Sequence, residues 1–155
     1  MNALDRLLIE QDCLKLMHAY CVFLDDGDHE GFLSLFTPDA IWLQTSEPVT
    51  ELRGHKGISR FLAHRPTDRL YRHMVQNPII TVNGPDEAHG FCIGLVVDGP
   101  NRPGQSPVPI FGVELVAEYR DTYRRDATGW HITRREMTRI LDRKAEPVSN
   151  PDPAT

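Results

Sequence analysis

The feature that most constrains this chain is a change of hydrophobic period close to residue 69. Before it, apolar residues recur every three or four positions, as on one face of a helix. After it come four long segments rich in Val, Ile, Tyr and Thr, separated by turns that contain Gly, Pro, Asn or Asp. Helices followed by a sheet of long strands are typical of the α+β fold class, which we therefore predict.

The N-terminal half predicts three helices and a short pair of strands. The first helix spans residues 3–24, and its spacing places on one buried face Leu7, Leu8, Leu14, Met17, Cys21 and Leu24. A second, short helix begins at Asp28, whose carboxylate is a favourable N-cap. Residues 40–44 and 51–53 resemble a first hairpin, and a third short helix follows the Gly-x-x-Gly turn at residues 54–57.

The C-terminal half predicts strands over residues 70–82, 87–98, 108–125 and 130–141. The connections hold no crossover helix, so we expect neighbouring strands to run antiparallel. A long, twisted sheet wrapped around a layer of helices leaves a cavity, which is a natural site for a small molecule. We predict one domain over residues 1–143 and a flexible tail over residues 144–155, which holds three prolines.

Composition narrows the classes of function. The chain has 155 residues, of which 40% are hydrophobic and 25% charged, and its formal net charge is −5. No basic block favours nucleic acid, and no apolar run approaches the ~20 residues of a membrane span. The three cysteines lack the spacing of a disulfide or zinc framework, so we expect reduced core thiols. Without a recognisable signal peptide, we expect a soluble cytoplasmic protein.

Three carboxylates stand where the first helix ends, at Asp25, Asp26 and Asp28. The helix dipole disfavours acids there by a few tenths of a kcal/mol to ~1 kcal/mol, so their presence invites an explanation. Asp28 is explained as the N-cap of the second helix, and Asp26 as a solvated surface acid. Asp25 follows the apolar Leu24 and could turn inward, either as a functional carboxylate or as a structural cap.

His73 lies on the first long strand, where alternation places it on one face with Tyr71 and Val75. It could be a core histidine with its hydrogen bonds satisfied. It could also be a general base, if a buried carboxylate fixes its tautomer and stabilises the imidazolium. The sequence alone does not show whether His73 meets Asp25, because the two are far apart in the chain.

Three further side chains are candidates for a binding cavity. Tyr20 could polarise an oxygen of a ligand, or it could be a core tyrosine with a bonded hydroxyl. Trp42 and Phe111 are apolar candidates for the lining, and Trp42 could equally belong to the core.

Arg135 is a candidate on the last strand. Strict alternation places it on the face of Met137, opposite Trp130 and Ile132. It could reach an anionic ligand or leaving group, and the alternative is a cross-strand ion pair on an exposed face.

Five stretches in this order resemble one protein family. They are Tyr-Cys-Val-Phe-Leu-Asp-Asp-Gly-Asp at 20–28, Leu-Phe-Thr-Pro-Asp-Ala-Ile-Trp at 35–42, Gly-His-Lys-Gly-Ile at 54–58, Arg-His-Met-Val-Gln-Asn at 72–77 and Gly-Trp-His-Ile at 129–132. Together they resemble the SnoaL-like branch of the NTF2-like superfamily. That branch includes relatives of scytalone dehydratase, of hexachlorocyclohexane dehydrochlorinase and of polyketide cyclases.

The resemblance implies a cone-shaped, cystatin-like fold, in which N-terminal helices pack on a strongly curved antiparallel or mixed sheet that encloses a pocket. It also implies that His73 and Asp25 form a base pair that works without metal or organic cofactor. Tyr20 matches a dehydratase-like tyrosine, and Arg135 lies near a pocket arginine of the dehydrochlorinase. The dehydrochlorinase-like pattern has a lysine near the helix end, which this chain lacks.

We therefore expect a cofactor-independent lyase, dehydratase-like, or an isomerase that acts on a small hydrophobic, aromatic or polyketide-like molecule. The alternative is a non-catalytic small-molecule-binding protein, or a partner similar to the β subunit of ring-hydroxylating dioxygenases. In that case Asp25 and His73 would form a structural pair. The resemblance further implies a homodimer or homotrimer.

Overall fold

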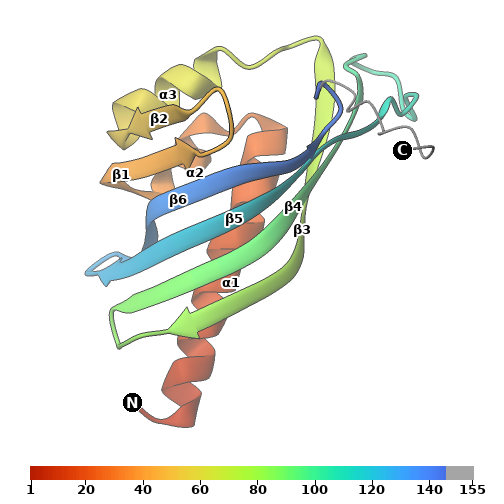
Figure 1. Ribbon diagram of the computed structural model, residues 1–155. Coiled ribbons are helices and arrows are strands. Elements are labelled where there is room, and N and C mark those ends of the chain that lie inside the picture. Colours follow the sequence, from red (N-terminus) through yellow and green to blue (C-terminus); the bar gives the residue numbers. More distant parts are fainter. Residues whose placement is uncertain (146–155) are drawn as a thin grey trace, which may run out of the picture.

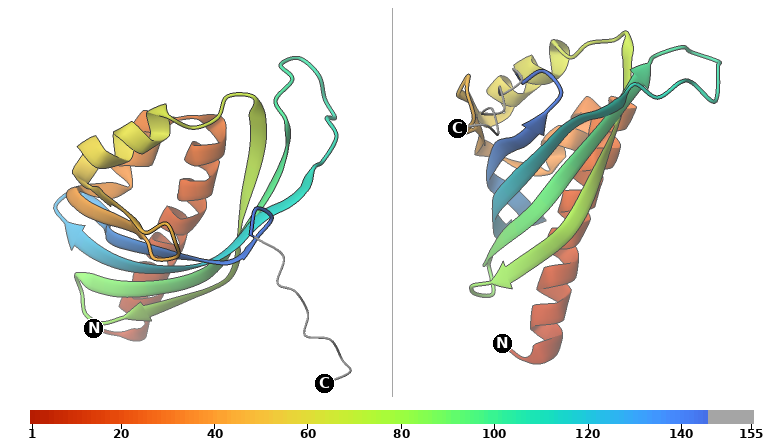
Figure 2. Two further views of the ribbon diagram at one scale, coloured as in Figure 1. Left: turned by 45° about the horizontal axis from the view of Figure 1, so that its top comes forward. Right: turned by 45° about the vertical axis from the view of Figure 1, so that its right-hand side comes forward.

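Three helices lie inside the curve of a single sheet (Figures 1 and 2). The computed structural model describes residues 1–145, so most of the predicted tail, residues 146–155, lies outside the described residues. The helices are α1 (Ala3–Asp26), α2 (His29–Ser34) and α3 (Gly54–Ala63). None of these helices combines the length and the apolar character needed to cross a membrane.

The sheet has six strands in the order β2-β1-β6-β5-β4-β3. The strands are β1 (Phe36–Gln44), β2 (Thr50–Arg53), β3 (Arg69–Val82), β4 (Glu87–Pro100), β5 (Gly112–Asp126) and β6 (Gly129–Asp142). All neighbours are antiparallel except β1 and β6, which run parallel, so the sheet is mixed. The predicted α+β class and the order of helices before long strands are confirmed.

The strand predicted from residue 108 begins four residues later, at Gly112. The intervening segment contains Pro109, which has no backbone N–H to donate to a ladder, and it directly follows Pro107. It therefore belongs to the loop between β4 and β5, which extends beyond the sheet in Figure 2.

Helix α1 is fixed at both ends by local chemistry. Asn2 and Asp5 form a reciprocal capping box, and Gly27 ends the helix with a left-handed φ of 70°. The buried face consists of Ile9, Cys13, Met17, Tyr20 and Leu24. The predicted face was wrong at its start, because the first turns extend past the edge of the sheet (Figure 1) and leave Leu7 and Leu8 58% and 56% exposed.

A β-bulge at Thr133 changes which side of β6 faces the helices. Tyr123 on β5 pairs with Ile132, but the preceding Thr122 pairs with Arg134, so Thr133 is an extra residue. Alternation is offset after that point. Arg135 consequently lies on the buried face that it shares with Ile132, and the strict alternation that placed the two on opposite faces was wrong.

The cysteines lie in or beside the core as free thiols. Cys13 and Cys92 are buried, and Cys21 is partly buried. Burial raises the pKa of Cys13 and of Cys92 to about 12, and that of Cys21 to about 11. All three therefore stay protonated at neutral pH.

Candidate functional site

A cavity of about 920 Å³ opens between the last turns of α1, helix α3 and the inner face of the sheet. Its volume lies within the range of ~300–1,000 Å³ that is common for small-molecule sites. The walls are largely apolar and aromatic, and they include Leu24, Val96, Leu115, Tyr119 and Met137. The hollow expected between the sheet and the helices is therefore present.

Asp25 and His73 meet at the wall of this cavity. Asp25 belongs to the last turn of α1 and His73 to β3. Asp25 Oδ1 lies 2.5 Å from His73 Nδ1, and Asp25 Oδ2 accepts a 2.8 Å hydrogen bond from the backbone N–H of His73. Only 7% of the Asp25 side chain and 14% of the His73 side chain are exposed. One residue therefore occupies both oxygens of a nearly buried carboxylate.

The Asp25 contact selects one tautomer of His73. An ionised carboxylate only accepts hydrogen bonds, so the proton of a neutral imidazole resides on Nδ1, which faces it. The lone pair then lies on Nε2, and the ring carrying it lines the cavity. This arrangement prepares His73 to accept a proton from a bound molecule, while Asp25 stabilises the resulting imidazolium.

Arg65, in the connection between α3 and β3, fastens the two elements that carry this pair. Its Nη1 donates a 2.6 Å hydrogen bond to the carbonyl of Leu24, the residue before Asp25. Its guanidinium carbon lies 5.3 Å from the ring centroid of Tyr71, whose ring is 6.4 Å from that of His73. Arg65 thus satisfies a carbonyl at the end of α1 and contacts β3 beside the imidazole.

Tyr20 lines the cavity from α1, five residues before Asp25, although the helix continues past both residues and does not end between them. Its ring packs against Phe32 at a centroid distance of 4.8 Å and against Tyr119 at 6.2 Å. Burial raises the pKa of the Tyr20 hydroxyl, although the nearby Arg135 acts in the opposite direction. Tyr20 is therefore a neutral hydroxyl that can donate a hydrogen bond.

The two apolar candidates have different outcomes. Trp42 lines the cavity and stacks on Phe61 of α3, with ring centroids 5.4 Å apart and an interplanar angle of 25°. Phe111 does not line it. It is 50% exposed in the loop before β5, beneath the guanidinium of Arg69, whose carbon lies 4.8 Å from the ring centroid.

Arg135 is committed to an internal ion pair and does not line the main cavity. It is 2% exposed, and its Nε and Nη2 donate to the two oxygens of Asp121 at 2.7 Å and 2.6 Å. Burial opposes the charge, but Asp121 outweighs it and raises the Arg135 pKa well above its usual range. The guanidinium carbon lies 3.9 Å from the ring centroid of Tyr20. Arg135 therefore forms a cross-strand ion pair, as the alternative expected, but on the buried face of the sheet and not on an exposed one.

Sequence reasoning missed several residues at the cavity. Phe61 and Tyr119 lie on elements that were predicted, and their aromatic character was the available signal. Nothing in the sequence marked Arg65, because its partners are a backbone carbonyl and a ring on other elements. Within residues 1–145, no group of three or more His, Cys, Asp or Glu side chains could hold a metal ion. That no cofactor takes part stays a prediction.

Comparison with known proteins identifies the family. A family model for the SnoaL-like domain matches residues 5–136. The chain belongs to the SnoaL-like family. A search among curated proteins found no significant match to this SnoaL-like domain.

Solved structures resemble this SnoaL-like domain over most of its length. An NTF2-like protein with a cystatin-like fold from Novosphingobium aromaticivorans is 25% identical, with a TM-score of 0.71 over 87% of this chain and 84% of that chain. A candidate scytalone dehydratase from the same organism is 18% identical, with a TM-score of 0.74 and 97% of each chain covered.

A type 2 hexachlorocyclohexane dehydrochlorinase is 17% identical, with a TM-score of 0.74 over 99% of this chain and 100% of that chain. At these identities the similarity to the dehydratase and the dehydrochlorinase is one of fold. The predicted family and the predicted NTF2-like, cystatin-like fold are confirmed.

Proposed function

We propose that this SnoaL-like domain is a cofactor-independent lyase, dehydratase-like, or an isomerase, with His73 as its general base. The observation that carries the proposal is the pair of hydrogen bonds between Asp25 and His73 at the wall of a large, mostly apolar cavity. The substrate is a small hydrophobic, aromatic or polyketide-like molecule, because Trp42, Phe61 and Tyr119 supply flat apolar surface.

The chemistry begins with proton abstraction. Nε2 of His73 takes a proton from a carbon next to an electron-withdrawing group, and Asp25 stabilises the imidazolium. In an elimination, the electron pair forms a carbon–carbon double bond as a leaving group departs. In an isomerisation, the electron pair moves onto a carbonyl oxygen, and a proton returns at another carbon. Proton transfer by a positioned side chain accelerates a reaction by about 10²- to 10⁴-fold.

Tyr20 has a separate role in this proposal. Its neutral hydroxyl donates a hydrogen bond to the oxygen that becomes negative or departs. Such a donor has most effect in a cavity with low dielectric, and the aromatic packing around Tyr20 supplies that environment.

The test measures proton abstraction directly. Purified protein is incubated in D₂O with a panel of small aryl ketones, with and without a β-hydroxyl group, and proton NMR follows both deuterium uptake next to the carbonyl and loss of water. We expect His73→Gln to lower the rate by about 10²- to 10⁴-fold. The matched control is His89→Gln, on a histidine outside the cavity. An unchanged rate in His73→Gln, with an unchanged melting temperature, would contradict the proposal.

One observation favours a second, non-catalytic function. The bond from the His73 backbone N–H to Asp25 is a structural link, since it joins α1 to β3 whatever the imidazole does. In that case the domain only binds its ligand, alone or as a partner similar to a dioxygenase β subunit. Tight binding of panel compounds without deuterium uptake or water loss would support this alternative.

We also propose that the protein works as a homodimer or homotrimer in the cytoplasm. Ile79 and Ile140 of the sheet are 60% and 52% exposed, which supports association through strand surfaces. Light scattering should then give a mass of two or three times 17.6 kDa, and a monomeric mass would contradict this part of the proposal.

A further inference from the structure

The lining of the cavity carries a net positive charge although the chain is acidic. Five cationic side chains line the cavity, against two anionic ones, which gives a net charge of +3 without the histidines. The cationic residues are Arg53, Lys56, Arg60, Arg65 and Arg139, and the anionic ones are Glu51 and Glu114. The whole chain has a formal net charge of −5. The charge of the lining is therefore opposite to that of the protein.

Both acids of the lining already have cationic partners. Glu51 forms an ion pair with Arg53 at 2.5 Å, and Glu114 pairs with Arg143 and with Lys144. They are therefore poorly placed to neutralise further cations of the lining.

Two of the other cations are also occupied. Arg139 donates to Asp142 and to Gln44, and Arg65 donates to the carbonyl of Leu24. Within residues 1–145, neither Lys56 nor Arg60 lies within 4.0 Å of a carboxylate oxygen.

Lys56, Arg60 and His64 form what we call the basic stripe. They are four residues apart, so they follow one face of α3 and its C-cap, and all three line the cavity. Ile58 and Leu62, which lie between them in sequence, are buried on the opposite side. Like charges four residues apart destabilise a helix by a few tenths of a kcal/mol. An anion beside the stripe would relieve this repulsion.

We infer that the ligand of this cavity carries an anionic oxygen group, such as a carboxylate, sulfonate or phosphate, which Lys56 and Arg60 bind. The apolar body of the ligand then lies against the stacked rings of Trp42 and Phe61. Phe61 directly follows Arg60 in the sequence. The inference rests on the proposed function only in taking this cavity as the ligand site, and it does not require His73 to act as a base.

Two fluorescent probes with the same ring system test the inference. One is 8-anilinonaphthalene-1-sulfonate, and the other is the uncharged N-phenyl-1-naphthylamine. We expect the wild type to bind the sulfonate about tenfold more tightly at low salt, and this preference should shrink as salt is added. The double variant K56Q/R60Q should lose the preference, while its affinity for the uncharged probe should stay within about twofold.

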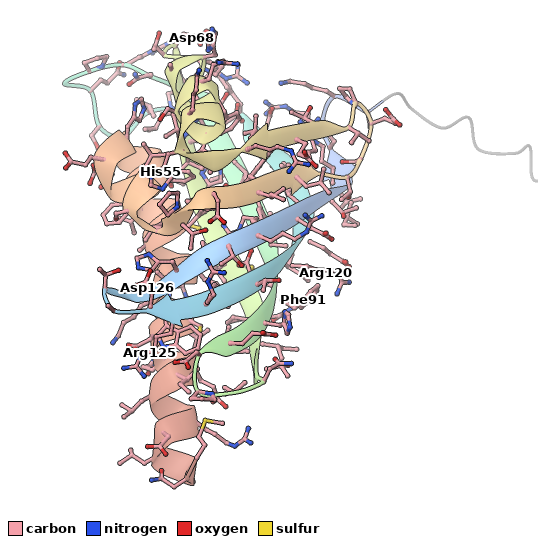
Figure 3. The ribbon with its side chains drawn as sticks, turned by 90° about the vertical axis from the view of Figure 1, so that its left-hand side faces the viewer. His55, Asp68, Phe91, Arg120, Arg125 and Asp126 are labelled. Carbon is pink, nitrogen blue, oxygen red and sulfur yellow. The ribbon has the colours of Figure 1, made fainter. Side chains whose placement is uncertain are left out.

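The matched control removes two arginines elsewhere. R124Q/R125Q changes the net charge equally at the exposed end of β5, and Figure 3 shows Arg125 far from α3. This variant should keep the preference. Equal affinity of the wild type for both probes, binding of neither probe, or an unchanged preference in K56Q/R60Q would overturn the inference.

A further variant separates this inference from the proposed function. His73→Gln should lose turnover and still prefer the sulfonate, because the basic stripe is intact. Retained turnover in His73→Gln would refute the proposed base and leave the anion preference to be decided by the probes alone. Loss of the preference in His73→Gln would overturn the assignment of the anion to the stripe.

Discussion

Asp25 has two oxygens, and both are used by His73, one by the ring and one by the backbone N–H. The ring contact selects the tautomer. The backbone contact holds the carboxylate beside the imidazole, at the point where β3 passes the end of α1. Beside this pair, Tyr20 provides a neutral donor. Behind Tyr20 lies a permanent positive charge, Arg135, which Asp121 balances. The candidate chemistry is thus confined to a few side chains with separate electrostatic roles.

The ion pair between Arg135 and Asp121 gives a prediction at this scale. Both side chains are buried, and Asp121 also accepts a 2.7 Å hydrogen bond from the Tyr123 hydroxyl. Asp121→Asn should lower the free energy of unfolding by about 3–5 kcal/mol, because it leaves the Arg135 cation buried without its counter-charge. Urea denaturation followed by tryptophan fluorescence measures the change.

The double variant D121L/R135M serves as the comparison for Asp121→Asn. It removes both charges, so it should recover much of the lost stability. If the single and double variants unfold at the same urea concentration, the ion pair does not have the role assigned to it.

At the residue scale, the sequence identified which side chains belong to the candidate site better than it identified where each side chain lies. Asp25, His73, Tyr20 and Trp42 were selected by residue type and by resemblance, and the structure brings all four to one cavity or its wall. Arg135 could not be placed because strict alternation does not foresee a bulge. Phe111 could not be placed because it lies outside the regular ladder, in the loop before β5.

Arg65 connects three elements, α1, α3 and β3. It lies after α3 and before β3, and it donates to the end of α1. Helix α1 also packs along β3 through its buried face. The docking of α1 on β3 therefore depends on both apolar burial and a charged hydrogen bond at the end where Asp25 lies.

This connection gives a prediction at the element scale. Arg65→Met should lower the free energy of unfolding by about 1–3 kcal/mol, because it removes a hydrogen bond from a charged donor to a partly buried carbonyl. It should also reduce the rate of deuterium exchange more than Arg65→Lys does, since lysine keeps the charge without the planar fork. Thermal melts and the NMR exchange assay measure the two effects, and equal exchange rates in both variants would argue against a positioning role.

Most elements were predictable because their periods are long and uninterrupted. The four long strands and α1 were found with ends shifted by a few residues. The buried face of α1 was harder, since Leu7 and Leu8 are as apolar as Ile9 and Cys13. Only the edge of the sheet determines which of them is covered, and the sequence does not mark where that edge passes the helix.

For the whole molecule, the buried thiols link stability to pH. Burial raises the pKa of Cys13 and Cys92 from 9.0 to about 12, so the folded state keeps protons that the unfolded state has lost in this window. Stability is therefore full below pH 9 and falls as the pH rises towards 12. Each thiol should contribute up to about 1.4 kcal/mol per pH unit of that decline.

Urea midpoints between pH 8 and pH 11 measure this decline. The variant C13A/C92A should show a flatter dependence, although it is less stable at pH 8 because it leaves small cavities. A dependence as steep as that of the wild type would mean that other groups cause the alkaline loss.

Thr133 has a consequence for the shape of the whole domain. With the bulge, Met137 and Arg139 line the cavity, and a β6 that lacked this one threonine would present the same two side chains there. The additional residue increases the curvature of the sheet, because a bulged strand bends and twists more than a regular one. Deleting Thr133 should therefore leave the residues that line the cavity unchanged and make the sheet flatter. We therefore expect Thr133 to affect the volume of the binding space more than its chemical character.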